Sequence, residues 1–243
     1  MSEKQTSKKG AQTVEDKERL FRRRSLEGRY RQRFTIAKEG KRALQMGDYR
    51  TMVLRYTDYL RIVAETYEAR SIYEIKPELF DKKKDVAELL LISQVYWELA
   101  KLYDQSDRVI DKLKSCLNQF VNFTINQDYQ SLNTEIVRKD LRKCRFKHEK
   151  IFKLSLESIY KDSRKCYIIT YFSKEETVVS DFRKFKSTLW NLGPVGKLLV
   201  SLYYQFSPKM ILLSEQSKVL KYIFQIGYYL AVFARSIVKL CTK

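Results

Sequence analysis

The chain is poor in the two residues that interrupt helices and form tight turns. It has 243 residues with only 7 Gly and 3 Pro, and the stretch from Glu78 to Trp190 contains neither. Average usage would supply about 12% Gly plus Pro. Sandwiches, barrels and parallel sheets need these residues at frequent turns, so their scarcity argues against those folds. The composition predicts an all-α protein of long helices.

The residues that usually carry catalysis and bind metals are also scarce. His148 is the single histidine, and histidine is the side chain that titrates near neutral pH. The cysteines Cys116, Cys144, Cys166 and Cys241 include no Cys-x-x-Cys pair, so a zinc site is not expected. No Gly-Lys-Ser/Thr phosphate loop and no acidic cluster with metal-loop spacing occurs. We expect no cofactor, no metal, no small-molecule substrate and no enzymatic activity.

One catalytic alternative stays open. Arg164 and Lys165 precede Cys166 in the sequence, and nearby cations lower the pKa of a thiol. His148 is the one imidazole that could serve as a base for a Cys166-dependent enzyme. The apolar residues 167–169 that follow favour a buried structural cysteine instead.

The charge is strongly one-sided. The chain has 48 Lys and Arg against 29 Asp and Glu, which gives a net charge of +19. Such an excess favours nucleic acid, anionic lipid headgroups or an acidic protein face as partners. The cysteine usage fits a reducing compartment, and the polar N-terminus lacks the apolar stretch of a secretory signal. We expect a cytoplasmic protein, with the inner face of the membrane as a peripheral location.

The N-terminal region combines a polar tail with an arginine-rich helix. Residues 1–12 have almost no apolar content, which predicts a disordered basic tail. Thr13 and Asp16 have the spacing of a capping box, which predicts a helix from about 14 to 46. The arginines that could follow a phosphate backbone are Arg22, Arg23, Arg24, Arg29, Arg31 and Arg33. Nucleic-acid binding through this cluster is an alternative function, although no aromatic stacking platform accompanies it.

Residues 36–64 carry the pattern of a helical hairpin. Gly40 is followed by Gly-Asp-Tyr at 47–49, and then by Tyr56 and Leu60. This pattern resembles one tetratricopeptide repeat, a pair of antiparallel helices. The resemblance implies that Gly40 allows close helix contact and that the aromatic and Leu side chains fill the space between the helices. No second clean copy occurs, although at least three stacked repeats are normally needed to bury their faces.

Apolar residues continue at helical spacing along the middle of the chain. A looser hairpin is expected over about 85–125, and a long basic helix over about 131–163 with His148 in its apolar stripe. These elements complete a helical region over 13–163. The aromatic candidates for a groove that binds a protein partner are Tyr49, Tyr56, Trp97 and Tyr103.

The segment that begins at Cys166 has a different character. It contains, in order, Cys-Tyr-Ile at 166–168, Asp-Phe-Arg-Lys-Phe at 181–185, Gly-Pro-Val-Gly-Lys at 193–197, Tyr203-Tyr204 and Ser207-Pro208. This order resembles the bacterial CFI-box C-terminal domain over about 166–210. That family has no assigned activity, so the resemblance implies a bacterial helical module over 164–243 and not a reaction.

Three local expectations follow within this module. The Gly-Pro-Val-Gly sequence can end one helix and start the next, with Pro194 in the first turn. Pro208 is expected to stop the helix that begins near Val195. The rings of Tyr203 and Tyr204 are expected in the core, with their hydroxyl groups reaching a surface partner.

In the last predicted helix, a narrow stripe of basic residues is surrounded by apolar residues. The uncharged run from Tyr222 to Ala234 has only 13 residues, whereas a membrane span needs about 20. Such a helix suits the membrane interface, and a terminal helix packed into the core is the other interpretation. The candidate residues for membrane contact are Lys218, Lys221, Phe224, Phe233, Arg235 and Lys239.

The sequence therefore predicts a non-enzymatic helical interaction or scaffold protein. Its hairpins would bind a protein partner, and its C-terminal helix would associate peripherally with an anionic membrane. Nucleic-acid binding and a Cys166-dependent enzyme remain the two alternatives.

Overall fold

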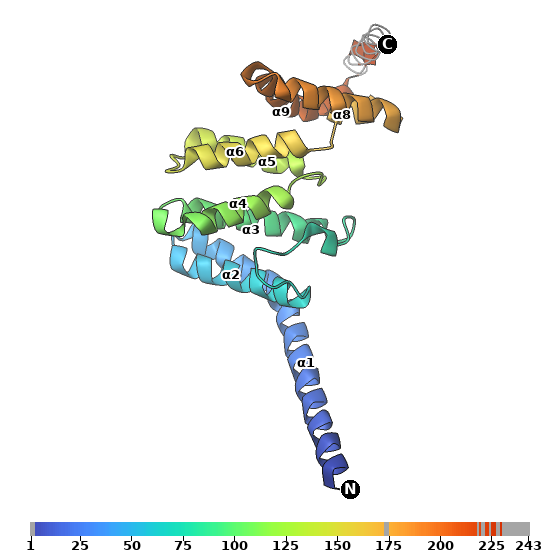
Figure 1. Ribbon diagram of the computed structural model, residues 1–243. Helices are drawn as coiled ribbons and strands as arrows, with labels where there is room; N and C mark the ends of the chain where they lie inside the picture. Colours follow the sequence, from blue (N-terminus) through green and yellow to red (C-terminus); the bar gives the residue numbers. More distant parts are fainter. Residues whose placement is uncertain are drawn as a thin grey trace. The chain divides into compact units, whose positions relative to one another are not determined.

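The computed structural model describes residues 3–172 and 175–217, together with 219, 222, 223, 225, 226 and 229; the side chains of 3–20, Arg22, Arg23 and Thr170 are not described. In this part of the chain every regular element is helical, which confirms the all-α fold (Figure 1). The α-helices are α1 (Glu3–Gln45), α2 (Tyr49–Thr66), α3 (Val86–Tyr103), α4 (Ile110–Asn122), α5 (Gln130–Lys143), α6 (Glu149–Asp162), α7 (Tyr167–Phe172), α8 (Glu176–Asn191) and α9 (Pro194–Gln216).

The chain forms two compact units. Unit 1 covers Met1–Phe120 and unit 2 covers Val121–Lys243. The boundary expected from the sequence, between 163 and 164, lies inside unit 2. Hydrogen bonds and stacked rings join α6 to the helices that follow it, so α5 and α6 form one unit with α7, α8 and α9.

In unit 1, α1 and α2 form the hairpin that the sequence predicts over 36–64. Gly47 has a φ of +76°, a backbone conformation that favours glycine. Asp48 caps α2, because its Oδ1 accepts a hydrogen bond of 3.0 Å from the backbone N–H of Thr51. A Cβ atom at Gly40 would lie 2.6 Å from the ring of Tyr56, so glycine here allows the close contact of the two helices.

Helix α1 begins at Glu3, in the stretch for which the sequence predicts a disordered tail. It is 43 residues long whereas α2 has 18, so its N-terminal part extends past the hairpin (Figure 1). The absence of proline and the many Lys, Glu and Gln residues favour propagation of a helix whose C-terminal half is anchored on α2.

The core of unit 1 lies where α2, α3 and α4 pack. The rings of Trp97 and Phe120 are 4.9 Å apart, and Leu89, Ile92 and Leu113 are fully buried. The expected hairpin over 85–125 is confirmed as α3 and α4.

Unit 2 contains a correction to the long helix expected over 131–163. The structure has two helices, α5 and α6, because the polar and basic sequence between 142 and 150 offers no continuous apolar stripe. Cys144 caps the end of α5 and is exposed, and His148 is the N-cap residue of α6. His148 therefore does not lie in the apolar stripe of a helix.

Helices α8 and α9 meet at the Gly-Pro-Val-Gly turn. Gly193 has a φ of +84° and Pro194 is the first residue of α9, as expected. A Cβ atom at Gly196 would lie 1.7 Å from the carbonyl oxygen of Leu189, so only glycine allows this contact between the helices.

The expectation that Pro208 ends this helix is wrong, because α9 continues to Gln216. Proline removes one helical hydrogen bond, but α9 packs against α5, α6, α7 and α8, and Ser207 before the proline and Ser214 after it are both buried.

Gly28 and Gly40 of α1 give a matched test of the α1–α2 contact. We expect Gly40→Ala to lower the free energy of unfolding by about 1–3 kcal/mol, because the new methyl group overlaps the packed Tyr56 ring. Gly28→Ala meets no atom within 4 Å and should stabilise the helix by about 1 kcal/mol. Urea denaturation measures both, and equal effects at the two positions would contradict the close contact.

Candidate interaction surface

The four aromatic residues expected to line a partner groove lie in different environments. Tyr56 and Trp97 are core residues, exposed by only 4% and 2%. Tyr49 is half-exposed, and Tyr103 is partly buried with the Lys112 ammonium 5.9 Å from its ring. The expectation of one groove is wrong for Tyr56 and Trp97, because their rings fill the interior between packed helices and are withdrawn from any partner.

Arg33 of the arginine cluster forms a buried ion pair. Its Nε lies 2.6 Å from Oε1 of Glu88, its Nη2 lies 2.9 Å from Oε2, and Glu88 is 4% exposed. The guanidinium also lies 3.6 Å from the centre of the Tyr30 ring. Burial and a hydrogen bond with Tyr67 raise the pKa of Tyr30, so that its hydroxyl group stays neutral beside Glu88. Arg33 is committed to joining α1 with α3 and is not available to a phosphate group.

The other arginines of the cluster differ in their availability. Arg29 is bound to Glu65 of α2 at 2.6 Å, whereas Arg24 and Arg31 are exposed. The side chains of Arg22 and Arg23 lie outside the described residues. Nucleic-acid contact through α1 therefore rests on fewer cations than the sequence offers.

Removal of the Arg33 charge should strongly destabilise unit 1. We expect Arg33→Met to cost about 3–5 kcal/mol, because it leaves the buried Glu88 side chain without its ion-pair partner. The double variant with Glu88→Leu should recover a large part of that loss in a urea titration. An additive effect of the two substitutions would contradict a direct buried pair.

Cys166 is buried, as the apolar residues after it predict. Its side chain packs with Ile169, Val178 and Val179. Burial raises the pKa of its thiol, and the opposing effect of Lys186 and Arg183 is smaller. A neutral, covered thiol is a poor nucleophile, so this environment favours the structural role.

The backbone just before Cys166 accepts several side-chain hydrogen bonds. The Lys186 ammonium donates hydrogen bonds to the carbonyl oxygens of Lys161, at 3.0 Å, and Ser163. The Tyr204 hydroxyl group donates to the carbonyl oxygen of Lys165 at 2.8 Å. These bonds fix α8 and α9 onto the end of α6.

Two further side chains bind the same segment. Arg183 donates from Nε to the carbonyl oxygen of Arg164 at 2.9 Å, and the Arg164 N–H donates to Asn126 at 2.6 Å. Cys166, Arg183 and Tyr204, which belong to separate elements of the sequence pattern over 166–210, therefore lie around one short segment.

The tyrosine pair has its rings in the core, as expected, but its hydroxyl groups bind backbone rather than a surface partner. The Tyr204 ring stacks on Tyr160 at 5.2 Å. The Tyr203 hydroxyl group accepts a hydrogen bond of 3.3 Å from the backbone N–H of Ile168. Both residues thereby hold α9 in place.

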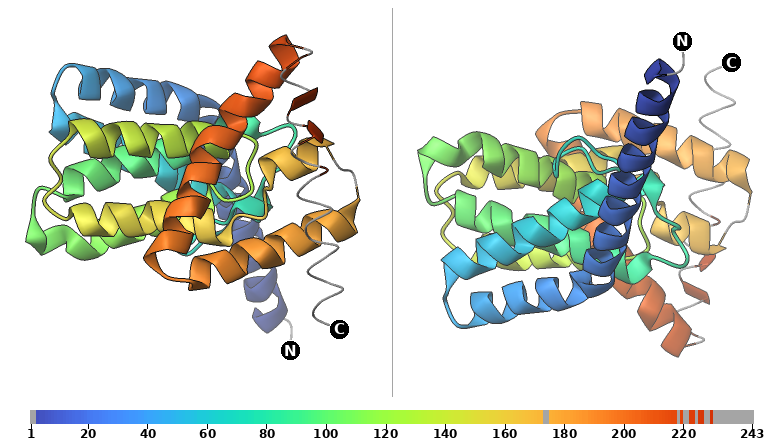
Figure 2. Two further views of the ribbon diagram at one scale, coloured as in Figure 1. Left: turned by 90° about the horizontal axis from the view of Figure 1, so that it is seen from above. Right: turned by 90° about the horizontal axis from the view of Figure 1, so that it is seen from below.

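The side of α9 opposite these contacts is apolar and exposed. Its inner side carries Gly196, Val200, Tyr204, Ser207 and Ser214. The residues of the other side, which we name the α9 outer face, are Val195, Leu198, Leu199, Leu202, Phe206 and Leu213. They are 39–68% exposed and recur at helical spacing on one side of the helix. In the left view of Figure 2, α9 crosses α5 and α6, with which it makes contact.

Two further large apolar side chains of unit 2 are exposed. Phe185 of α8 and Leu192 before the turn are 57% and 68% exposed. Lys209 is the one charged residue within the stripe of the α9 outer face. A contiguous exposed apolar surface of this kind marks an interaction site.

The α9 outer face was not predicted from the sequence, because the helix was expected to stop at Pro208. The available signal was the recurrence of Val195, Leu198, Leu199, Leu202 and Phe206 on one side of the helix, while Val200 and Tyr204 lie on another side. One buried face does not require both sets of apolar residues.

The residues predicted for membrane contact, Lys218, Lys221, Phe224, Phe233, Arg235 and Lys239, lie outside the described residues. Among their described neighbours, Val219, Tyr222, Ile223, Ile226 and Tyr229 are exposed. No helix within the described part of the chain is long and apolar enough to cross a membrane.

The described residues contain no group of three or more His, Cys, Asp or Glu side chains that could hold a metal ion. No family model, no curated protein and no solved structure matches this chain.

The thiols of Cys116, Cys144 and Cys166 differ in exposure, and labelling can test this difference. Burial raises the pKa of Cys116 to about 12 and that of Cys166 above its ordinary value, whereas Cys144 is exposed. A maleimide at pH 7 should modify Cys144 within minutes and the two buried thiols only in denaturant, as mapped by mass spectrometry. Rapid native labelling of Cys166 would contradict its structural role and return it to consideration as a nucleophile.

Proposed function

We propose that this protein is a non-enzymatic interaction protein that associates peripherally with an anionic membrane through unit 2. The observation that carries the proposal is the α9 outer face, an exposed row of aliphatic and aromatic side chains on a firmly held helix. A helix of this kind lies in the interface plane, with its apolar side among the headgroups and the first part of the acyl chains.

The energy available from this face fits reversible binding. Full burial of a large apolar side chain stabilises by about 1.5–3 kcal/mol, so six half-exposed side chains supply about 6 kcal/mol. That is close to the affinity of a single myristoyl chain, which gives only marginal membrane binding. A second attraction is therefore needed.

The charge of unit 2 supplies that attraction. Residues 121–243 contain 22 Lys and Arg against 10 Asp and Glu, a net charge of +12. Anionic lipids attract such a surface within a Debye length of about 10 Å. Residues 218–239 carry a stripe of Lys and Arg among apolar residues in the sequence. They would add to both the apolar and the electrostatic contribution to membrane binding.

A protein partner is the second part of the proposed function, and it belongs to unit 1. An open groove of about 370 Å³ lies between α1 and the end of α2, lined by Phe21, Ser25, Leu26, Arg29 and Glu65. Phe21 is 76% exposed on the part of α1 that extends past α2. The tetratricopeptide-like and CFI-box-like patterns are consistent with such a scaffold.

Vesicle flotation tests the membrane role. Purified protein should float with phosphatidylglycerol vesicles, and part of the binding should survive 0.5 M salt because the apolar contribution is not screened. The double variant Leu198→Asp/Phe206→Asp should lose at least ten-fold in binding, since it places two charges in the apolar stripe.

The matched control is Leu54→Asp/Leu132→Asp, which changes two equally exposed leucines on α2 and α5. It makes the same change in charge and should leave flotation unchanged, and circular dichroism checks that both variants stay folded. Equal losses in the two variants, or unaltered flotation of the α9 variant, would refute the proposal.

A further inference from the structure

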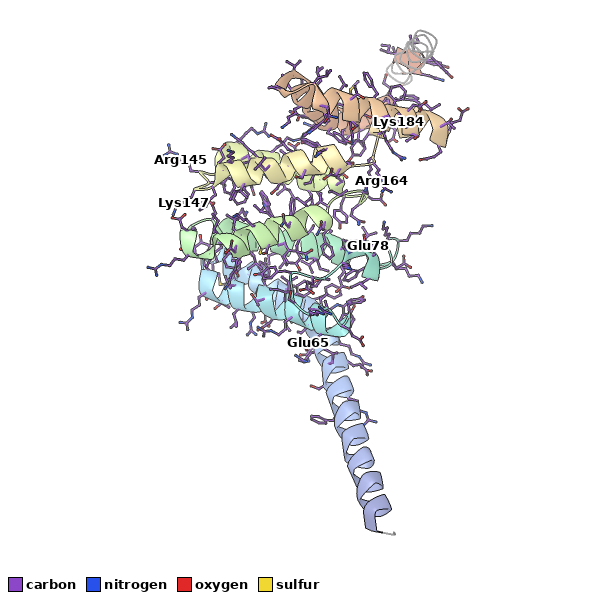
Figure 3. The ribbon with its side chains drawn as sticks, in the orientation of Figure 1. Glu65, Glu78, Arg145, Lys147, Arg164 and Lys184 are labelled. Carbon is purple, nitrogen blue, oxygen red and sulfur yellow. The ribbon has the colours of Figure 1, made fainter. Side chains whose placement is uncertain are left out.

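The loop between α5 and α6 concentrates positive charge at one end of the hairpin. Five cations lie in this loop and in the helix ends on either side of it. They are Arg142, Lys143, Arg145, Lys147 and Lys150. Arg145 and Lys147 are labelled in Figure 3, at the end of the hairpin that this loop forms. All five residues are exposed. We name this set the α5–α6 basic loop.

The neighbouring carboxylates do not bind all the cations of this loop. Glu149 is bound to Lys153 at 2.6 Å, and Glu135 is bound to Arg138 at 2.7 Å and only distantly to Arg142, at 3.7 Å. Within the described part of the chain, Lys143, Arg145 and Lys150 have no carboxylate within 4 Å. Lys150 also lies in the first turn of α6, where the helix dipole disfavours a cation.

The loop is nevertheless held in one conformation. The Phe146 ring stacks on the buried Phe152 ring at 4.2 Å. The backbone N–H of Cys144 donates to the carbonyl oxygen of Asp140, and that of Ile151 donates to the carbonyl oxygen of His148, both at 2.8 Å. The cations are therefore gathered at a fixed place, where their like charges repel one another.

The helix that follows this loop lies against α9. Lys197 of α9 is bound to Glu157 of α6 at 3.1 Å. Glu157 lies eight residues after Glu149, the first residue of α6, which is about 12 Å along the helix axis. The start of α6 therefore lies little more than one Debye length from this ion pair at moderate salt.

We infer that the α5–α6 basic loop is the electrostatic docking element for the headgroups of an anionic bilayer, acting together with the α9 outer face. This inference rests on the proposed function. Reversible peripheral proteins become stably bound when an apolar insertion and a polybasic surface act together. In unit 2, the α9 outer face supplies the apolar insertion and the α5–α6 basic loop supplies the polybasic surface.

Lipid fits this loop better than nucleic acid does. A single-stranded nucleic acid needs exposed aromatic rings on which its bases stack, and the phenylalanine ring in the loop, Phe146, stacks on Phe152 instead. A nucleic-acid backbone also offers nothing to an apolar face, whereas a bilayer accommodates both surfaces.

Charge reversal of the loop tests the inference in the full-length protein. The triple variant Lys143→Glu/Arg145→Glu/Lys150→Glu should bind phosphatidylglycerol vesicles about 100-fold more weakly at 0.1 M salt. Its binding at 0.5 M salt, and its weak binding to phosphatidylcholine vesicles, should equal that of the unaltered protein, because the apolar contribution is intact.

The matched control is Lys82→Glu/Lys83→Glu/Lys84→Glu, which reverses three exposed lysines in unit 1 and changes the net charge equally. Its binding to phosphatidylglycerol vesicles should weaken by less than five-fold. Equal losses in the two triple variants would show that net charge alone attracts the membrane and would overturn the inference.

A second result would overturn it in another way. If the protein binds a 20-nucleotide oligonucleotide at 0.15 M salt more tightly than the vesicles, and the loop variant loses that binding, the loop is a nucleic-acid site. Failure of the loop variant to change vesicle binding, while Leu198→Asp/Phe206→Asp still abolishes it, would remove this inference and leave the proposed function standing.

Discussion

The arrangement of unit 2 depends on the binding of one short backbone segment, Ser163–Cys166. The Ser163 N–H donates to the carbonyl oxygen of Ile159 at the end of α6, and the carbonyl groups of Ser163, Arg164 and Lys165 accept from Lys186, Arg183 and Tyr204. A buried ammonium at the carboxyl end of a helix is favourable, since it meets both the free carbonyl groups and the helix dipole. Burial lowers the pKa of Lys186, and the carbonyl oxygens compensate for part of that cost.

The fixed position of α9 explains why an exposed apolar row can persist. One side of the helix is bound through Tyr204 and through the glycine contact at Gly196, so the outer side cannot turn inward to hide its leucines. A helix with two apolar sides is unfavourable in water unless a partner covers one of them. The basic loop between α5 and α6 has the same character, because an external anion would relieve the repulsion among its cations. Both features are consistent with one anionic, partly apolar partner surface.

Much of the fold could be predicted from the sequence, and the errors have physical causes. The scarcity of glycine and proline predicts helices, and Gly47, Gly193 and Pro194 mark real turns because their backbone requirements are local. Whether a side chain is buried depends on residues that are distant in the sequence. Tyr56 and Trp97 looked like groove residues although they fill the core, and Arg33 looked free although Glu88, distant in sequence, binds it. Pro208 failed as a stop signal because tertiary packing holds α9 on both sides of it. The α9 outer face could be found only once its inner contacts were known.

The most direct test of the account is the environment of the α9 outer face at a membrane. A polarity-sensitive fluorophore on Leu199→Cys, in a background with Cys144→Ser and Cys241→Ser, reports the surroundings of one exposed position. The account predicts a blue shift and loss of iodide quenching when phosphatidylglycerol vesicles are added, with no change for the same probe on Leu54→Cys in α2. An unshifted spectrum at residue 199 under conditions where the protein floats with the vesicles would contradict it.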